Sequence, residues 1–221
     1  MLARLRMSKR IGLLGGSFNP AHRGHRRLSL ASIEALGLDE LWWLVSPGNP
    51  LKAGASDMAP FEARLASAKA MARHAPIRAL DLERRLGTRF TIDTVKRIKR
   101  LFPGDRFIWL LGSDTIPEFH KWRDYRGLAR ICPIAVLNRT GYDRRARAAR
   151  VMGWLRRFVR PASQARQWTE WSAPAIVFLR LPPDPTSATA LRASDPDWHT
   201  NWTEGRPRAF RSRIDNSKET I

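Results

Sequence analysis

The sequence predicts a single α/β domain built on a doubly wound parallel sheet. Short apolar runs bounded by turn residues are typical of buried strands, and helix-periodic stretches separate the first of these runs. This alternation indicates parallel strands joined by crossover helices. The length of 221 residues fits one such domain.

The expected elements follow directly from these runs. The predicted strands are residues 11–14, 41–45, 77–80, 107–111, 134–137 and 176–179, and the predicted helices are residues 24–36, 60–74 and 91–102. Asp57 and Pro60 are start signals for the second helix. Because such sheets bind ligands at the carboxyl ends of their strands, we expect the chemistry in the loops after Leu14, Val45, Leu111 and Leu179.

Two segments lie outside this pattern. Residues 143–160 carry many arginines, and Val151, Leu155 and Phe158 are spaced to share one face, which predicts a single solvated surface helix. We expect the domain to cover residues 1–193. The remaining residues, 194–221, are polar and poorly periodic, and we expect a loop or disordered tail there.

The composition carries a large positive charge. Lys and Arg total 40 against 20 Asp and Glu, a formal net charge of +20. This predicts attraction to polyanions, whether nucleic acid, nucleotides or a membrane surface, although a biased genome would give the same arginine content. No apolar run reaches the roughly 20 residues of a membrane span, and the single Cys132 excludes a disulfide framework and a cysteine zinc cluster. We expect a cytoplasmic protein.

The strongest motif is residues 15–25, Gly-Gly-Ser-Phe-Asn-Pro-Ala-His-Arg-Gly-His, directly after the first predicted strand. Gly15 and Gly16 let the backbone approach a phosphate, and the helix N-terminus that follows offers N–H groups to an anion. The motif is neither Gly-x-Gly-x-x-Gly nor a Walker A loop, which disfavours a Rossmann dehydrogenase and a P-loop kinase.

Two histidines, His22 and His25, are three residues apart in this motif. On the first turn of a helix they would converge on one ligand and could donate to phosphate oxygens. A role in helix capping is the structural alternative. Metal ligation is disfavoured because the sequence has neither a His-Glu-x-x-His helix nor a cysteine cluster, and we predict no protein metal site.

These residues resemble the Gly-Gly-x-Phe-x-Pro-x-His-x-Gly-His signature of adenylyltransferases in the Rossmann-like nucleotidyltransferase superfamily. The likeness is greatest to the bacterial nicotinate-nucleotide adenylyltransferases and extends from Ile11 to about Arg192. It implies transfer of AMP from ATP to nicotinate mononucleotide, with Mg²⁺ carried on the ATP phosphates, and deamido-NAD and pyrophosphate as products of NAD biosynthesis. His22 and His25 would then be catalytic, and Gly15, Gly16, Ser17 and Phe18 would bind ATP.

A second match follows the strand at 107–111. The segment 112–115, Gly-Ser-Asp-Thr, and the later Trp122 resemble a family segment that binds the acceptor. The resemblance implies that Asp114 contacts the acceptor ribose and that Trp122 stacks on the pyridine ring. A helix cap for Asp114 and a core position for Trp122 are the alternatives.

Three further segments resemble family motifs with departures. Phe90 stands where the family usually has tyrosine, and it precedes Thr91 at a helix start that would receive the acceptor carboxylate. Ser187, Thr189 and Arg192 match a Ser-x-Thr-x-Ile-Arg motif that would bind the β- and γ-phosphates of ATP. A capped helix is the alternative reading of both segments. Lys52 lies in a loop that lacks the usual histidine, near the expected acceptor phosphate.

The sequence therefore predicts ATP and nicotinate mononucleotide as the partners. Related adenylyltransferases that use nicotinamide mononucleotide or phosphopantetheine remain the alternative within the enzyme class. A basic nucleic-acid-binding module would explain the charge but not four anion-binding loops at strand ends, so we expect no specific nucleic acid. The oligomeric state is left open.

Overall fold

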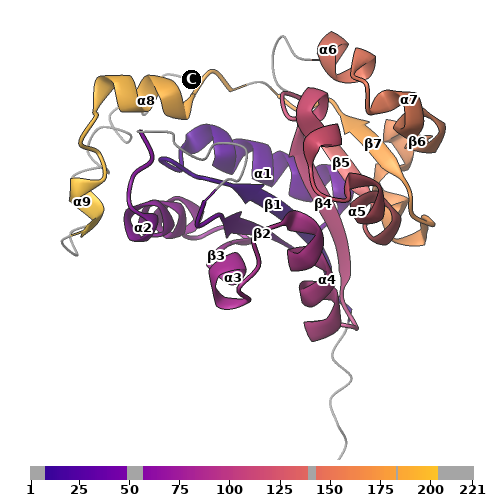
Figure 1. The fold of residues 1–221 in the computed structure, drawn as a ribbon, viewed down its shortest axis with the longest axis horizontal. Helices are drawn as coiled ribbons and strands as arrows, with labels where there is room; N and C mark the ends of the chain where they lie inside the picture. The colour runs from indigo at the N-terminus through magenta and orange to yellow at the C-terminus, as the bar shows by residue number, and fades with distance from the viewer. Residues whose placement is uncertain (1–7, 49–56, 139–142, 183, 204–221) are drawn as a thin grey trace, which may run out of the picture.

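A computed structural model describes residues 8–48, 57–138, 143–182 and 184–203 (Figure 1). One parallel sheet organises the fold, with the strand order β3-β2-β1-β4-β5-β7-β6. The strands are β1 (Arg10–Gly16), β2 (Glu40–Val45), β3 (Ile77–Leu80), β4 (Arg106–Gly112), β5 (Ile134–Leu137), β6 (Val159–Arg160) and β7 (Ile176–Leu179). The predicted fold class is confirmed, and the short strand β6 is an addition to the predicted set.

Helices connect the strands and cover the sheet. The α-helices are α1 (Arg23–Leu36), α2 (Phe61–Ala72), α3 (Leu82–Arg85), α4 (Thr91–Leu101), α5 (Tyr125–Ile131), α6 (Asp143–Ala148), α7 (Met152–Leu155), α8 (Ala188–Ser194) and α9 (Thr200–Thr203). Short 3-10 helices are η2 (Ile116–Lys121), η3 (Arg156–Phe158) and η4 (Ala162–Glu170). The three predicted crossover helices correspond to α1, α2 and α4, within two residues at each end.

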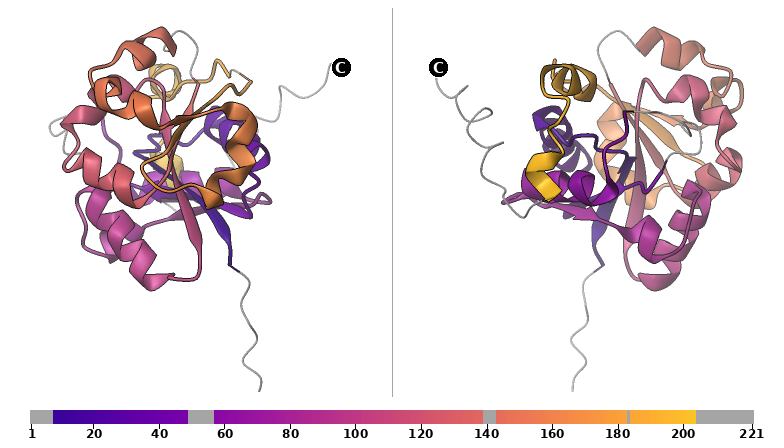
Figure 2. Two further views of the ribbon diagram at one scale, coloured as in Figure 1. Left: turned by 90° about the vertical axis from the view of Figure 1, so that its right-hand side faces the viewer. Right: turned by 60° about the vertical axis from the view of Figure 1, so that its left-hand side comes forward.

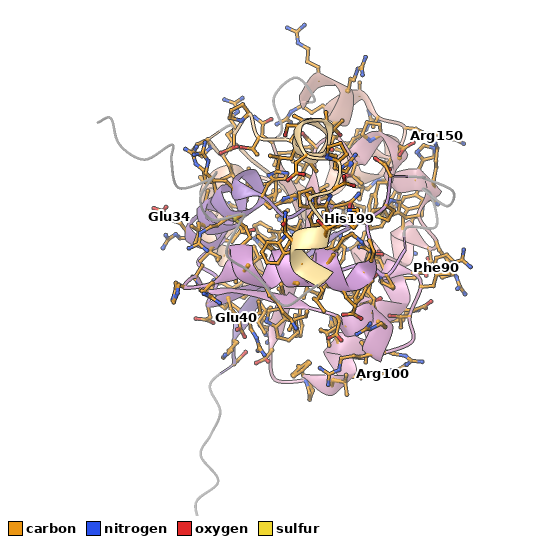
Figure 3. All side chains as sticks on the ribbon, turned by 90° about the vertical axis from the view of Figure 1, so that its left-hand side faces the viewer. Glu34, Glu40, Phe90, Arg100, Arg150 and His199 are labelled. Atoms are coloured by element: carbon orange, nitrogen blue, oxygen red, sulfur yellow. The ribbon has the colours of Figure 1, made fainter. Side chains whose placement is uncertain are left out.

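The core has two halves, one on each face of the sheet. In β2, Trp42 and Leu44 point into the half that packs against α4 and α5, whereas Trp43 and Val45 point into the half that packs against α1, α2 and η4. Strands buried on both faces explain why the sequence reads as continuous apolar runs. Figure 2 shows the helices on both faces, and in Figure 3 Glu34 of α1 and Phe90 before α4 lie on opposite sides of the molecule.

The chain changes direction across the sheet between β1 and β4. Strands β2 and β3 lie on one side of β1, and β4 pairs with its other side, with Leu14 opposite Leu110. A ligand site in a doubly wound sheet forms outside the carboxyl ends of the strands at such a switch point. The loops after β1 and β4, which carry two of the predicted motifs, are therefore neighbours.

The segment 143–160 differs from the single surface helix that we predicted. It forms two short helices, α6 and α7, then η3 and the edge strand β6. Val151 and Leu155 are buried, each with 1% exposure. Met152, on another face, is also buried, with 7% exposure. A chain buried on more than one side cannot remain a straight amphipathic surface helix.

The structure also differs from the expected tail over residues 195–203. Trp198 is 1% exposed, and α9 packs against α2. Trp198 and the half-buried Trp202 supply the apolar area that holds this segment on the domain. Residues 204–221 lie outside the described part of the chain.

Two sequence expectations concern the environment of the chain. Cys132 is a free and fully buried thiol, and burial raises its pKa to about 12, which keeps it unreactive. Of the helices that the structure describes, none has the length and apolar character to cross a bilayer.

Candidate active site

The loop after β1 brings the predicted phosphate-binding residues to the switch point. Gly15 and Gly16 complete the strand instead of starting the loop, and a Cβ on Gly15 would lie 3.0 Å from the indole of Trp109. Phe18 has a φ of 48°, a left-handed conformation that non-glycine residues rarely adopt. Its buried ring stacks on Trp43 at 5.0 Å, which fixes the turn. Backbone strain held by packing is frequent at binding sites.

His22 and His25 lie together at the start of α1, as predicted. Their ring centroids are 3.8 Å apart, and His22 is the N-cap residue, 2% exposed. The backbone N–H of His22 donates to Nδ1 of His25 at 3.2 Å. An accepting Nδ1 places the proton of the neutral ring on Nε2, so His25 presents Nε2–H as its donor. The two histidines therefore cap the start of α1 and lie side by side there.

Gly24 allows a distant segment to approach His22. A Cβ on Gly24 would lie 3.0 Å from Nδ1 of His22 and 3.2 Å from Oδ1 of Asp184. Asp184 belongs to the segment between β7 and α8, and it binds Arg27 of α1 at 3.0 Å. Burial opposes its ionisation, but bonds from Thr186 and Arg27 lower the pKa of its carboxyl below the usual range. This contact anchors the chain that leads to α8.

Arg192 of α8 contacts the loop after β1. Arg192 donates from Nη1 to the carbonyl oxygen of Asn19 at 2.7 Å, and its Nη2 lies 2.7 Å from Oδ2 of Asp57. Asn19 in turn donates to the carbonyl of Asp57 at 2.8 Å and accepts from the N–H of Ala59. The two predicted ATP-binding segments, far apart in the sequence, are therefore in direct contact.

The hydroxyls of this motif have different surroundings. Ser187 is the N-cap of α8, and its side chain accepts from the N–H of Ala190 at 3.1 Å. Thr189 is exposed on the first turn of α8. Ser17 lies half-buried in the loop after β1, and its carbonyl oxygen binds Arg64 at 2.8 Å.

Trp122, a predicted acceptor-binding residue, is linked to the end of β1 through Trp109. The ring of Trp122 packs edge-on against Trp109 at 6.3 Å and against Phe119 at 5.4 Å. Trp109 is the same side chain that lies beneath Gly15. Trp122 is thus partly a core aromatic, as one alternative had it, but it is only half-buried and keeps a surface toward solvent.

The start of α4 contacts Arg123, the residue that follows Trp122. Phe90 is its N-cap, and the guanidinium of Arg123 lies 4.7 Å from the Phe90 ring centroid. Arg123 also lies 3.5 Å from the carboxylate of Asp93. The N–H groups of Asp93 and Thr94 turn back to the Phe90 carbonyl, so an anion would meet the first N–H groups of the helix and the half-buried Thr91.

Two predicted acceptor residues have less structural definition. Asp114 follows β4, half-buried, at the carboxyl edge beside β1. Lys52 lies outside the described residues.

Sequence reasoning missed a buried charged network behind the site. Arg64 of α2 is 1% exposed and donates to the carbonyls of Ser17, Ser46 and Pro47 at 2.8, 2.7 and 3.3 Å, and to that of Ala59 at 3.0 Å. Its burial lowers its pKa. Arg64 therefore ties the loop after β1 to the loop after β2.

A buried acid lies on the other side of Ser46. Glu83 of α3 is 7% exposed, and burial raises its pKa to about 7 despite a hydrogen bond with the Ser46 side chain. Nothing in the sequence distinguishes Arg64 or Glu83 from the many exposed charges of this chain. An apolar stripe along α2 would have shown which of its faces is buried. The helix has no strong stripe, because it is buried on several sides.

The β1 loop, the start of α1 and Arg192 of α8 come together at one edge of the sheet. Imidazole, guanidinium and backbone N–H donors line the carboxyl edge around β1. In the described ranges, no group of three His, Cys, Asp or Glu side chains is placed to hold a metal ion. Such a site can orient phosphates and neutralise their charge, which is what transfer of a phosphoryl or nucleotidyl group requires.

The comparisons with known proteins agree with this chemistry. Residues 13–194 match the family model described as cytidylyltransferase-like. A protein named "Probable nicotinate-nucleotide adenylyltransferase" from Erythrobacter litoralis (strain HTCC2594) is 53% identical over 196 residues, which covers 89% of each chain. A protein of the same name from Gluconobacter oxydans (strain 621H) is 48% identical over 185 residues, 84% of this chain and 94% of its own.

Solved structures resemble the fold at much lower identity. Plasmodium falciparum nicotinic acid mononucleotide adenylyltransferase complexed with NaAD matches with a TM-score of 0.58 and 18% identity, over 84% of this chain and 83% of that chain. At that identity the likeness shows the fold alone. From the family model and the relatives, the chain belongs to the cytidylyltransferase-like family and, within it, to the nicotinate-nucleotide adenylyltransferases.

Proposed function

We propose that this protein transfers AMP from ATP to nicotinate mononucleotide. A phosphate oxygen of the mononucleotide attacks the α-phosphorus of ATP, the bond from that phosphorus to the bridging oxygen breaks, and pyrophosphate leaves. The products are nicotinate adenine dinucleotide and pyrophosphate. No covalent enzyme intermediate is required, because both reactants carry the reacting groups.

The residues around β1 are proposed to hold the triphosphate. Gly15, Gly16, Ser17 and Phe18 would form its floor, and His22 and His25 would donate to the α-phosphate as charge develops there. The Nε2–H of His25 inferred above supports this assignment. Ser187, Thr189 and Arg192 would bind the β- and γ-phosphates, which is supported by the contact of Arg192 with the β1 loop.

Magnesium is proposed to enter with ATP. Among the described residues, no cluster of carboxylates is placed to bind a metal ion. Phosphate oxygens of ATP and water would then be the main ligands of the magnesium ion. When bound, the ion neutralises charge on the phosphates of ATP. The protein's own contribution is then positioning of the two substrates and donation to the oxygens that gain charge.

The acceptor is proposed to lie toward Trp122 and the start of α4. Trp122 would stack on the pyridine ring, Asp114 would bind the ribose, and Lys52 would approach the acceptor phosphate. Phe90 and Thr91 begin a helix whose first N–H groups suit the ring carboxylate of the nicotinate form. Arg123, which contacts Phe90, adds positive charge on the same side.

The observation that carries this proposal is the contact between Arg192 and the carbonyl of Asn19, which joins the two predicted ATP-binding segments. The test is release of pyrophosphate from ATP with each acceptor. We expect kcat/KM for nicotinate mononucleotide to exceed that for the amide by about a hundredfold, because two unpaired polar groups cost about 1–3 kcal/mol each. Equal values for the two acceptors would exclude the nicotinate assignment, and phosphopantetheine serves as the third acceptor.

We also propose that the protein acts in the cytoplasm. The single cysteine of the chain is buried as a free thiol, which suits a reducing compartment.

A further inference from the structure

A cavity of about 710 Å³ lies at the β6 end of the sheet. Its walls come from the C-terminal part of α1, from α6, from β6 and the first part of η4, and from the end of β7 and the residues after it. Figure 1 shows β6, β7 and α6 gathered at one end of the molecule, with α2 and α9 at the other. None of the residues assigned to adenylyl transfer lines this cavity. Its volume falls within the roughly 300–1,000 Å³ of small-molecule sites.

Positive charge dominates the cavity. Arg147, Arg160, Arg166 and Arg180 line it, and no Asp or Glu is among its lining residues. Within the part of the chain that the structure describes, the guanidinium groups of Arg160 and Arg180 make no hydrogen bond or ion pair. Guanidinium groups around a hollow raise the local potential, and each can bind a phosphate through two parallel N–H groups.

The other two arginines are already oriented. The guanidinium of Arg147 lies 4.6 Å from the ring centroid of Phe178, and Arg166 donates from Nη2 to the carbonyl of Glu34 at 2.8 Å. Stacking on an aromatic face leaves the N–H groups of a guanidinium in its plane available to a ligand. Side chains that are held before binding lose less conformational entropy when an anion arrives.

A partly exposed apolar strip lies beside these charges. Val159 is 38% exposed, and it lines the cavity together with Phe178 and Leu181. The pairing of β6 with β7 ends at Arg160 opposite Val177, while β7 continues to Leu179. A second copy of this chain is a poor occupant, because each copy carries a net charge of +20.

We propose that this cavity is a second anion-binding site, which takes a small molecule with adjacent phosphate groups. Four arginines match the charge of a di- or triphosphate, and the apolar strip accommodates an attached flat group. The shared chemistry is the polyphosphate, whether inorganic or part of a nucleotide. The site is separate from the ATP that reacts, and it stands independently of the proposed function.

The test is calorimetric titration of the full chain with inorganic tripolyphosphate, in the Arg192→Ala background so that the reaction site contributes less. We expect the pair Arg160→Gln and Arg180→Gln to weaken binding at least tenfold. The matched control is Arg144→Gln with Arg156→Gln, which removes the same charge from exposed arginines outside the cavity. This control should change the affinity less than twofold. Equal weakening in both pairs would mean unspecific attraction to a cationic surface and would overturn the proposal.

Further titrations identify the source of the phosphates. Displacement of tripolyphosphate by ATP, with tighter binding than tripolyphosphate itself, would indicate a nucleotide, and equal or weaker binding would indicate an inorganic anion. Binding of a poly-glutamate peptide that depends on Arg160 and Arg180, without binding of tripolyphosphate, would overturn the proposal in favour of an acidic peptide. Substitution by lysine at both positions should restore part of the affinity, and thermal unfolding confirms that each variant is folded. Adenylyl transfer by the Arg160 and Arg180 variant in the otherwise native chain should be unchanged at saturating substrate, so the two proposals fail separately.

Discussion

The guanidinium of Arg192 and the carboxylate of Asp57 lie 2.7 Å apart, at the edge of the β1 loop. If Arg192 binds the β- and γ-phosphates of ATP, those phosphates compete with Asp57 for it. We predict that Arg192→Ala raises the KM for ATP about 10- to 100-fold, the loss of one charged hydrogen bond of about 1.5–3 kcal/mol. The KM for the acceptor should change little. Steady-state kinetics with each substrate varied in turn measures both values.

Asp57→Asn supplies the control for this prediction. Asp57 is 57% exposed at its side chain, so the ion pair is worth about 0–1 kcal/mol, and its removal should lower the KM for ATP by no more than about fivefold. In the Arg192→Ala background the same substitution should have no effect. A defect confined to the acceptor in Arg192→Ala would contradict the assignment of α8 to ATP.

His25 gives the second prediction, which depends on its inferred tautomer. His25→Ala should lower kcat by about 10²–10³, because one donor to developing charge contributes about 2.7–4 kcal/mol. His25→Asn is the matched control, since its amide oxygen can still accept from the N–H of His22 while its amide nitrogen does not reach the Nε2 position. We expect His25→Asn to keep the melting temperature and to lose activity like alanine. Near-normal turnover in the folded variants would exclude a catalytic histidine here.

Arg64 supports the third prediction, which concerns stability. Arg64→Met leaves up to four carbonyl oxygens without a donor and should lower the free energy of unfolding by about 2–4 kcal/mol. Arg64→Lys should lose less stability, yet raise the KM for ATP, because one ammonium cannot span both loops. The control is Arg100→Met, an exposed position at the end of α4 labelled in Figure 3. Denaturant unfolding and ATP kinetics test both effects, and equal loss in the Arg64 and Arg100 variants would refute the network.

Glu83 leads to a prediction about pH. Its folded pKa of about 7 is above the ordinary 4.5, so the folded protein holds a proton that the unfolded chain has already released. Stability from this group is therefore full below pH 4.5 and falls as the pH rises to about 7, by about 3 kcal/mol in total. Glu83→Gln should remove this loss, so that its stability relative to the native chain rises from pH 5 to pH 8. If the difference in unfolding free energy between Glu83→Gln and the native chain stays constant from pH 5 to pH 8, the pKa of Glu83 is not raised in the folded protein.

The sheet could be predicted from the sequence because its strands are buried on both faces. The runs at 41–45 and 107–111 are apolar throughout, so neither the register nor the neighbours had to be known. The two histidines were equally visible, since their spacing on one helical turn is a local property.

The parts that could not be predicted depend on contacts distant in the sequence. Arginines are usually exposed, so the sequence does not indicate that Arg64 is buried. Its burial depends on the loops after β1 and β2, whose carbonyls accept its hydrogen bonds. Trp198 stands in a polar segment, and its burial follows from the docking of α9 on α2. The strand β6 has only two residues, Val159 and Arg160, which is too short to show an alternating pattern, so only its pairing with β7 reveals it.

The bond from Arg192 to Asn19 joins residues 173 positions apart. During synthesis the first strand and its loop leave the ribosome early, whereas α8 emerges after every strand of the sheet has been made. A growing chain can therefore form most of its core before it has a complete nucleotide site. If Arg192 binds ATP as proposed, full affinity for ATP arises only after residue 192 has been made and α8 has packed against the β1 loop.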